Sequence, residues 1–193
     1  RHRSLGSDLN GEPFKADWEY TTVVGMLMFL VNTRPNIQFA VHQCTRFNHN
    51  PKMSHIYAIK QIVRYLLVTQ ENGKDKGLTF DIADDEVTSV ECYVDVDFAG
   101  LWNIENEANP VSSKSRTGFV ILIGNCPVVW QSKLQTETAL STAEAEIVAL
   151  SQSMRELVWL RWLIVDVAST LGAELKKDIE VKSKVFEDNN GAI

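Results

Sequence analysis

Three acidic residues stand where carboxylates could do chemistry. Asp95 lies inside the strand-like stretch YVDVDFAG, Glu146 lies in AEAEIVAL, and Asp188 lies in FEDNNGAI. Aspartate is a poor strand residue and is costly to bury without a partner. Convergent carboxylates without a compensating Arg or Lys repel one another, so such a cluster is expected to hold cations. A set of ligands made only of oxygen favours magnesium or manganese over zinc or copper.

The chemistry that such a site would support is phosphodiester hydrolysis. Two ions about 4 Å apart can activate a water molecule and stabilise the leaving oxygen. Asp97 lies two residues beyond Asp95, so an extended strand would point both carboxylates to one face, and Asp97 is a weaker candidate ligand. The alternative is that Asp97, Glu144 and Glu187 are solvent-facing acids and that the three candidates are merely their neighbours. The pattern of residues leaves both interpretations open.

The elements that must position these acids form a mixed α/β plan. Residues 1–16 are polar and are predicted to be a linker or a torn end, and residues 17–74 are predicted to hold three helices. Residues 75–193 are predicted to be the α/β domain. Its strands are expected at 77–80, 90–98, 117–124 and 127–130, with a long helix over about 138–169 and a final strand before Asp188.

Composition narrows the class of protein. Of the 193 residues, 45% are hydrophobic and 23% are charged, as is usual for a globular domain. The net charge of −6 is unevenly divided, because residues 1–80 carry 10 Lys and Arg against 6 Asp and Glu, whereas residues 81–193 carry 9 against 19. No apolar run is long enough to span a membrane, and no secretory signal is visible. Cys44, Cys92 and Cys126 are predicted to be reduced core residues.

A family resemblance runs through most of the chain, over about residues 17–193. The segment from YTTVVG to RYLLVT resembles the region after the polymerase fingers and palm in copia-type retrotransposon polyproteins. Five later stretches are similar, in the same order, to motifs of that family's ribonuclease H domain: YVDVDFAG, WQSKLQ, ALSTAEAEIVAL, WLRWLI and EDNNGAI. The family forms are Y-x-DADWAG, W-x-SKKQ, ALSSTEAEY-x-AL, WLR-x-LL and DN-x-x-AI.

The resemblance implies a fold, a reaction and partners. The fold would be a ribonuclease H-like mixed sheet with a long helix, preceded by a small helical subdomain like the thumb or connection of a reverse transcriptase. The reaction would be metal-dependent hydrolysis of the RNA strand of RNA–DNA hybrids. The partners would be the hybrid and the upstream polymerase domain of the same polyprotein, without a membrane. The location would be intracellular, cytoplasmic or in virus-like particles, and the protein would not be secreted.

The resemblance also assigns roles residue by residue. Asp95, Glu146 and Asp188 match the family's metal-binding carboxylates. Two magnesium ions are expected, one held by Asp95 with Glu146 and the other by Asp95 with Asp188, and manganese could substitute. Departures from the family pattern include Phe98 in place of Trp and Ile147 in place of Tyr.

Several expectations follow from the extent of the match. The family's fold continues past residue 193 with a fourth metal-binding acid, so the domain is expected to be truncated at its C-terminus and weak or inactive alone. Two alternatives stay open: a catalytically inactive or decayed retroelement remnant that only folds or binds, and another nuclease of ribonuclease H-like fold, such as an integrase core.

Several residues are predicted to be structural rather than catalytic. The tryptophans Trp130, Trp159 and Trp162 are predicted to be core or packing residues. His55 is predicted to pack against or cap the start of a helix rather than to bind a metal.

Overall fold

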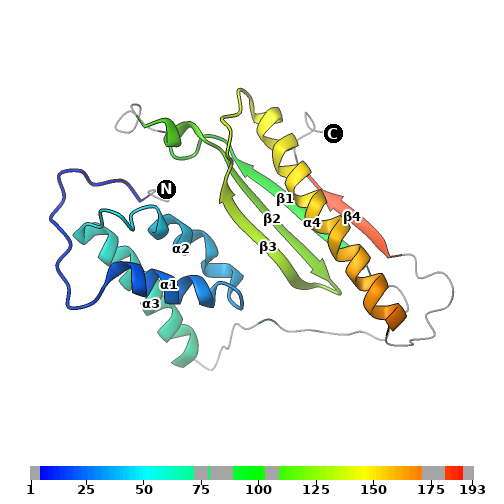
Figure 1. Cartoon of the computed structure of the whole chain (residues 1–193), viewed down its shortest axis with the longest axis horizontal. Coiled ribbons are helices and arrows are strands. Elements are labelled where there is room, and N and C mark those ends of the chain that lie inside the picture. The colour runs from blue at the N-terminus through cyan, green and yellow to red at the C-terminus, as the bar shows by residue number, and fades with distance from the viewer. Residues whose placement is uncertain (1–4, 72–77, 79–88, 103–108, 171–180, 189–193) are drawn as a thin grey trace. The chain divides into compact units, whose positions relative to one another are not determined.

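The chain forms two compact units, Arg1–Leu78 and Thr79–Ile193, and each is described by itself. The computed structural model describes residues 5–71, 78, 89–102, 109–170 and 181–188 (Figure 1). Within these ranges no helix is long and apolar enough to cross a lipid bilayer.

The first unit, here called the helical unit, is built from three α-helices and one short 3-10 turn. Helix α1 spans Tyr20–Leu30, η1 spans Pro35–Ile37, α2 spans Gln38–Thr45 and α3 spans Met53–Glu71. Pro35 stands at the first position of η1, where its missing N–H and fixed φ are no disadvantage. One cluster of buried apolar side chains has members from or next to every one of these helices: Tyr20, Val24, Leu27, Val31, Ile37, Val41, Cys44, Ile59 and Ile62.

The start of α3 is fixed by a buried histidine. The backbone N–H of Lys52 donates to Nδ1 of His55 at 2.9 Å, which leaves the proton on Nε2, and Nε2 donates to the carbonyl oxygen of Gly6 at 2.9 Å. The imidazole also stacks on Phe47, with ring centroids 4.0 Å apart. The prediction that His55 packs and caps is therefore confirmed. Contacts of Leu5 and Phe14 with the core show that residues 5–16 are partly packed on the helices, which their polar composition did not indicate.

The second unit, here called the sheet unit, has a four-stranded mixed sheet in the order β3-β2-β1-β4. Strand β1 spans Ser89–Asp97, β2 spans Arg116–Ile123, β3 spans Cys126–Leu134 and β4 spans Lys182–Phe186, with the short turn η3 over Pro110–Ser113. The pairs β1–β2 and β2–β3 are antiparallel, and β1–β4 is parallel. Gly124 and Asn125 join β2 to β3 with positive φ at both positions, the geometry that a two-residue hairpin needs. The predicted mixed α/β class is confirmed.

Helix α4, Thr142–Thr170, lies across one face of this sheet (Figure 1). It starts at a cap: the backbone N–H of Glu144 donates to Oγ of Ser141, and a carboxylate oxygen of Glu144 accepts from the backbone N–H of Leu140. This cap places the start four residues after the predicted residue 138. The core beneath α4 consists of Val90, Cys92, Val94, Phe119, Ile121, Ala149, Leu157 and Val181.

The predictions for the tryptophans, the cysteines and the strand at 77–80 had different outcomes in the structure. Of the predicted core or packing roles of Trp159 and Trp162, the core role was wrong, because their side chains are 67% and 60% exposed. Only one face of the 29-residue helix α4 contacts the sheet, and these two rings lie outside that face and contact each other. Trp130 is half-buried in β3, and the three cysteines are buried and free, as predicted. The strand predicted at 77–80 falls almost entirely outside the described residues.

Candidate metal centre

Asp95 is placed by the alternation of β1. Val90, Cys92 and Val94 point into the core, and Asp95 follows as an exposed residue near the end of the strand. Its Oδ1 accepts a hydrogen bond from the backbone N–H of Val96 at 2.8 Å. The residue opposite Asp95 on β2 is Gly118, so no side chain stands directly beside this carboxylate on the neighbouring strand.

Asp188 is brought to the same end of the sheet by parallel pairing. The β1–β4 ladder ends with Tyr93 opposite Phe186, whose rings stack with centroids 4.6 Å apart. Asp188 lies two residues beyond that pair, just as Asp95 does on β1. The carboxyl ends of parallel strands are a recurrent place for ligands in α/β folds, because both chains leave the sheet there in the same direction.

Glu146 comes from the second turn of α4. It is 6% exposed and lies on the same helix face as Ala145 and Ala149, which pack toward the sheet with no exposed surface. Glu144 lies two residues earlier, about 200° around the helix, and caps it instead. A carboxylate is seldom buried to this degree unless a cation or a hydrogen-bond partner holds it.

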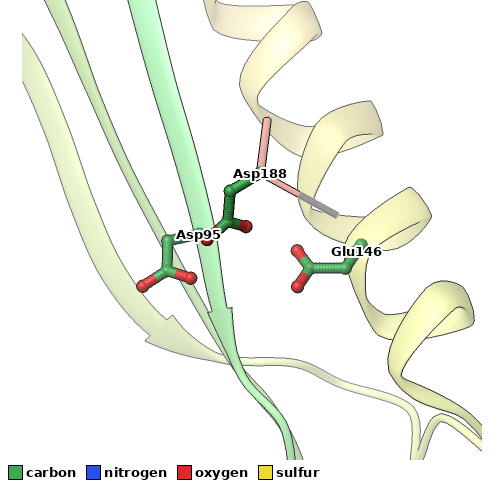
Figure 2. A group of neighbouring side chains, drawn as sticks. All are labelled: Asp95, Glu146 and Asp188. Carbon is green, nitrogen blue, oxygen red and sulfur yellow. The ribbon is translucent and has the colours of Figure 1, made fainter. Parts of the chain in front are cut away.

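These three acids converge. One carboxylate oxygen from each of Asp95, Glu146 and Asp188 lies within 4.8 Å of the others, a spacing that would let them share metal ions (Figure 2). In Figure 2 the carboxylate of Glu146 extends from α4 toward the strand that carries Asp95. A β-strand, a helix and the segment after a second strand thus meet at one end of the sheet, although the residues are far apart in the sequence.

The electrostatics of the centre are unfavourable without a cation. The pKa of Glu146 is raised from 4.5 to about 7, mainly by burial and in addition by the negative charges of Glu187, Asp95 and Asp188. Oε2 of Glu146 is buried and has no hydrogen-bond partner among the described residues. An unsatisfied carboxylate oxygen that faces other acids is what a cation would stabilise.

Asp97, the weaker candidate, lies outside this group of three. Its carboxylate covers Gly100 in the turn after β1, where a Cβ built on Gly100 would lie 2.0 Å from both carboxylate oxygens. The turn also contains Ala99 with a positive φ of 47°. Asp97 therefore shapes the turn that ends β1.

A buried amide that the residue pattern did not single out lies near the centre. Gln135, the last residue of WQSKLQ, is 3% exposed and donates from Nε2 to the carbonyl oxygen of Ala145 at 2.9 Å. The signal available in the sequence was the position of a polar residue directly before the loop to α4.

Comparison with known proteins shows which family this chain is similar to. The chain is 38% identical over 143 residues to the retrovirus-related Pol polyprotein from transposon TNT 1-94 of Nicotiana tabacum, which is 74% of this chain and 10% of that protein. It is 32% identical over 155 residues to the Pol polyprotein from transposon RE1 of Arabidopsis thaliana, again 10% of that protein. The chain belongs to the copia-type, retrovirus-related Pol polyprotein family.

A third relative of this chain has a different length and name. The chain is 36% identical over 142 residues to the secreted RxLR effector protein 161 of Plasmopara viticola, and the match covers 90% of that protein. By contrast, the chain spans about a tenth of the two plant Pol polyproteins. No protein-family model and no solved structure matches the chain. The match thus covers most of the effector protein but only a small part of the two Pol polyproteins.

Proposed function

We propose that the sheet unit is the ribonuclease H part of a retrotransposon reverse transcriptase, which hydrolyses the RNA strand of RNA–DNA hybrids with magnesium. The observation that carries this proposal is the convergence of Asp95, Glu146 and Asp188 within 4.8 Å at the carboxyl ends of two parallel strands. Membership of the Pol polyprotein family supports a retroelement enzyme in general, and the acid cluster favours its nuclease part.

The residues of the centre fit magnesium. All three ligands are carboxylates, the oxygen donors that hard divalent cations prefer. The buried Oε2 of Glu146 has no hydrogen-bond partner among the described residues, which suits an open ligand position. Bound magnesium would supply Lewis-acid chemistry, lowering the pKa of a water molecule and stabilising the charge on the leaving oxygen.

Asp95, Glu146 and Asp188 would have different roles, which follow from their positions. Asp95 is central, since it would contribute to both cation positions, one with Glu146 and one with Asp188. Glu146 is the least exposed of the three acids, so its carboxylate is held in place and shielded from bulk water. Asp95 and Asp188 are exposed and would face the scissile phosphate of the bound hybrid.

The helical unit would contact the backbone of the hybrid, as a thumb- or connection-like part of the reverse transcriptase. Residues 1–80 carry an excess of four positive charges, which suits contact with phosphates. Such contacts position a duplex without reading its sequence. The upstream polymerase domain would be the partner in the same polyprotein.

A second candidate, a catalytically inactive remnant that only folds or binds, is favoured by one observation. The match covers most of the effector protein, so a relative of this chain exists that is much shorter than the two Pol polyproteins. In a remnant, the acids would stay close together but would not support cleavage.

Cleavage of a labelled RNA–DNA hybrid tests the proposal. Two forms are compared in magnesium: the chain itself, and the chain joined to the segment that follows the matched region in the tobacco relative. We expect weak or no cleavage by the first form and cleavage of the RNA strand alone by the second. Asp95→Asn should abolish that cleavage, whereas Asp97→Asn should retain it. Equal cleavage by the Asp95→Asn protein would overturn the proposal.

A further inference from the structure

A buried polar network lies between the strand that carries Asp95 and the helix that carries Glu146. The side chain of Gln135 donates from Nε2 to Oγ1 of Thr117 at 3.1 Å and to the carbonyl oxygen of Ala145 at 2.9 Å. The backbone N–H of Gln135 donates to the carbonyl oxygen of Ser115 at 2.9 Å. Ser115, Thr117 and Ala145 have no exposed surface, so water does not compete for these bonds.

The orientation of the Gln135 amide follows from its partners. A backbone carbonyl can only accept, so the nitrogen and not the oxygen of the side chain must face Ala145. Both protons of Nε2 are then used, one on Ala145 in the first turn of α4 and the other on Thr117 in β2. No side chain without two donors at this position could make both bonds.

The network continues to the end of β1. Oγ of Ser115 accepts from the backbone N–H of Ala99, which lies in the turn directly after β1. Thr117 pairs with Val96 in the β1–β2 ladder, one residue from Asp95. Gln135 itself follows β3, and Ala145 directly precedes Glu146. One chain of hydrogen bonds therefore links the turn after the Asp95 strand to the helix turn that holds Glu146.

We propose that Gln135 is a positioning residue for the metal centre, which fixes the separation of Glu146 from Asp95 by anchoring the start of α4 to β2. The inference rests on the proposed function, because it gives this anchoring a purpose in metal binding. Residues that orient metal ligands from outside typically change metal affinity by 10- to 100-fold when they are replaced.

A matched pair of variants separates positioning from general stabilisation. Gln135→Met has a similar volume but no donors, so it breaks the bond to Ala145 and frees the start of α4. Thr117→Val is isosteric and leaves one Nε2 proton of Gln135 without its acceptor, but it keeps the bond to Ala145. Gln135→Met removes both side-chain hydrogen bonds and Thr117→Val removes one of them, so both variants should lower the melting temperature. Only the first should disturb Glu146.

The test has two readouts on the whole chain, magnesium affinity by calorimetric titration and backbone hydrogen exchange without metal. We expect Gln135→Met to weaken magnesium binding about tenfold or more, and Thr117→Val to change it less than about twofold. Exchange of the amides in residues 142–148 should accelerate in Gln135→Met relative to the rest of α4, but not in Thr117→Val. If Gln135→Met does not fold, Gln135→Asn, which keeps the amide one methylene shorter, should show the same two effects.

The outcomes distinguish this inference from the proposed function. Equal magnesium affinity in the unaltered, Gln135→Met and Thr117→Val proteins would overturn the positioning role while leaving the nuclease proposal intact. An absence of magnesium binding by the unaltered chain would overturn the proposed metal centre. In that case the exchange comparison still decides whether Gln135 anchors α4, and equal exchange in the two variants would overturn that as well.

Discussion

Each unit contains a buried side chain that can carry a charge, His55 in one and Glu146 in the other, and these two differ in how their polar atoms are hydrogen-bonded. His55 in the helical unit has no exposed surface, both ring nitrogens are hydrogen-bonded, and its ring stacks on Phe47. Glu146 in the sheet unit is 6% exposed, its Oε2 has no hydrogen-bond partner among the described residues, and two further acids lie within 4.8 Å.

The contrast between His55 and Glu146 is that between a structural side chain and a candidate functional one. A buried polar side chain with all its bonds made stabilises the fold and fixes its local geometry. A buried carboxylate among like charges lowers stability, and strongly perturbed groups of this kind cluster at functional sites. His55 is therefore complete within the helical unit, whereas a cation would complete the surroundings of Glu146 in the sheet unit.

The largest expected effect is on the helical unit. His55→Ala removes two buried hydrogen bonds and a ring stack, so it should lower the free energy of unfolding by about 3 kcal/mol. Urea unfolding measures this change, and His49→Ala, at an exposed position, is the control with an expected change below about 0.5 kcal/mol. Similar urea midpoints for the two variants would contradict the structural role of His55.

The next effect is a pH dependence in the sheet unit without metal. The pKa of Glu146 in the folded state is about 7, above its ordinary 4.5, so the folded state binds this proton more tightly than the unfolded state. The resulting stability is fully present below pH 4.5 and is lost as pH rises through about 7, a loss on the order of 2 kcal/mol. Unfolding in a chelator at pH 5 and pH 8 measures it, and Glu146→Gln should flatten the difference. Unchanged pH dependence in Glu146→Gln would contradict the assignment of this pH-dependent stability to Glu146.

The smallest effect is expected at Asp97, whose carboxylate lies over Gly100 and outside the group of three. Asp97→Asn should change the free energy of unfolding by less than about 0.5 kcal/mol. The magnesium dissociation constant, measured by calorimetry, should stay within about twofold of that of the unaltered protein, whereas replacing a residue that orients a metal ligand changes it tenfold or more. A tenfold weakening would instead place Asp97 in the centre.

Local patterns in the sequence predicted much of this arrangement. Alternation identified β1 and its outward Asp95, helical spacing identified α4, and motif order linked Glu146 and Asp188 to the same centre. Alternation and helical spacing are short-range patterns that fix side-chain direction within an element but give no contacts between elements. The link among the three acids came instead from the family resemblance, which runs over most of the chain.

What the patterns missed depends on such contacts. The partners of Gln135 come from β2 and α4, so its role is visible only when these elements are packed together. Trp159 and Trp162 lie on the side of α4 that does not pack on the sheet, so their aromatic character alone did not show whether they are buried. Leu5 and Phe14 pack on the helical unit although the residues around them are polar.

Thermal melting in magnesium and in chelator tests the central claim most directly, because a cation that binds the folded centre and not the unfolded chain must stabilise the fold. Magnesium at about 100 times its dissociation constant should add about 2.7 kcal/mol. The unaltered protein should therefore melt at a higher temperature in magnesium, while Glu146→Gln should lose most of that increase and be slightly more stable in chelator. Coincident melting curves in magnesium and chelator for both proteins would contradict the account, leaving these acids without a metal-binding role.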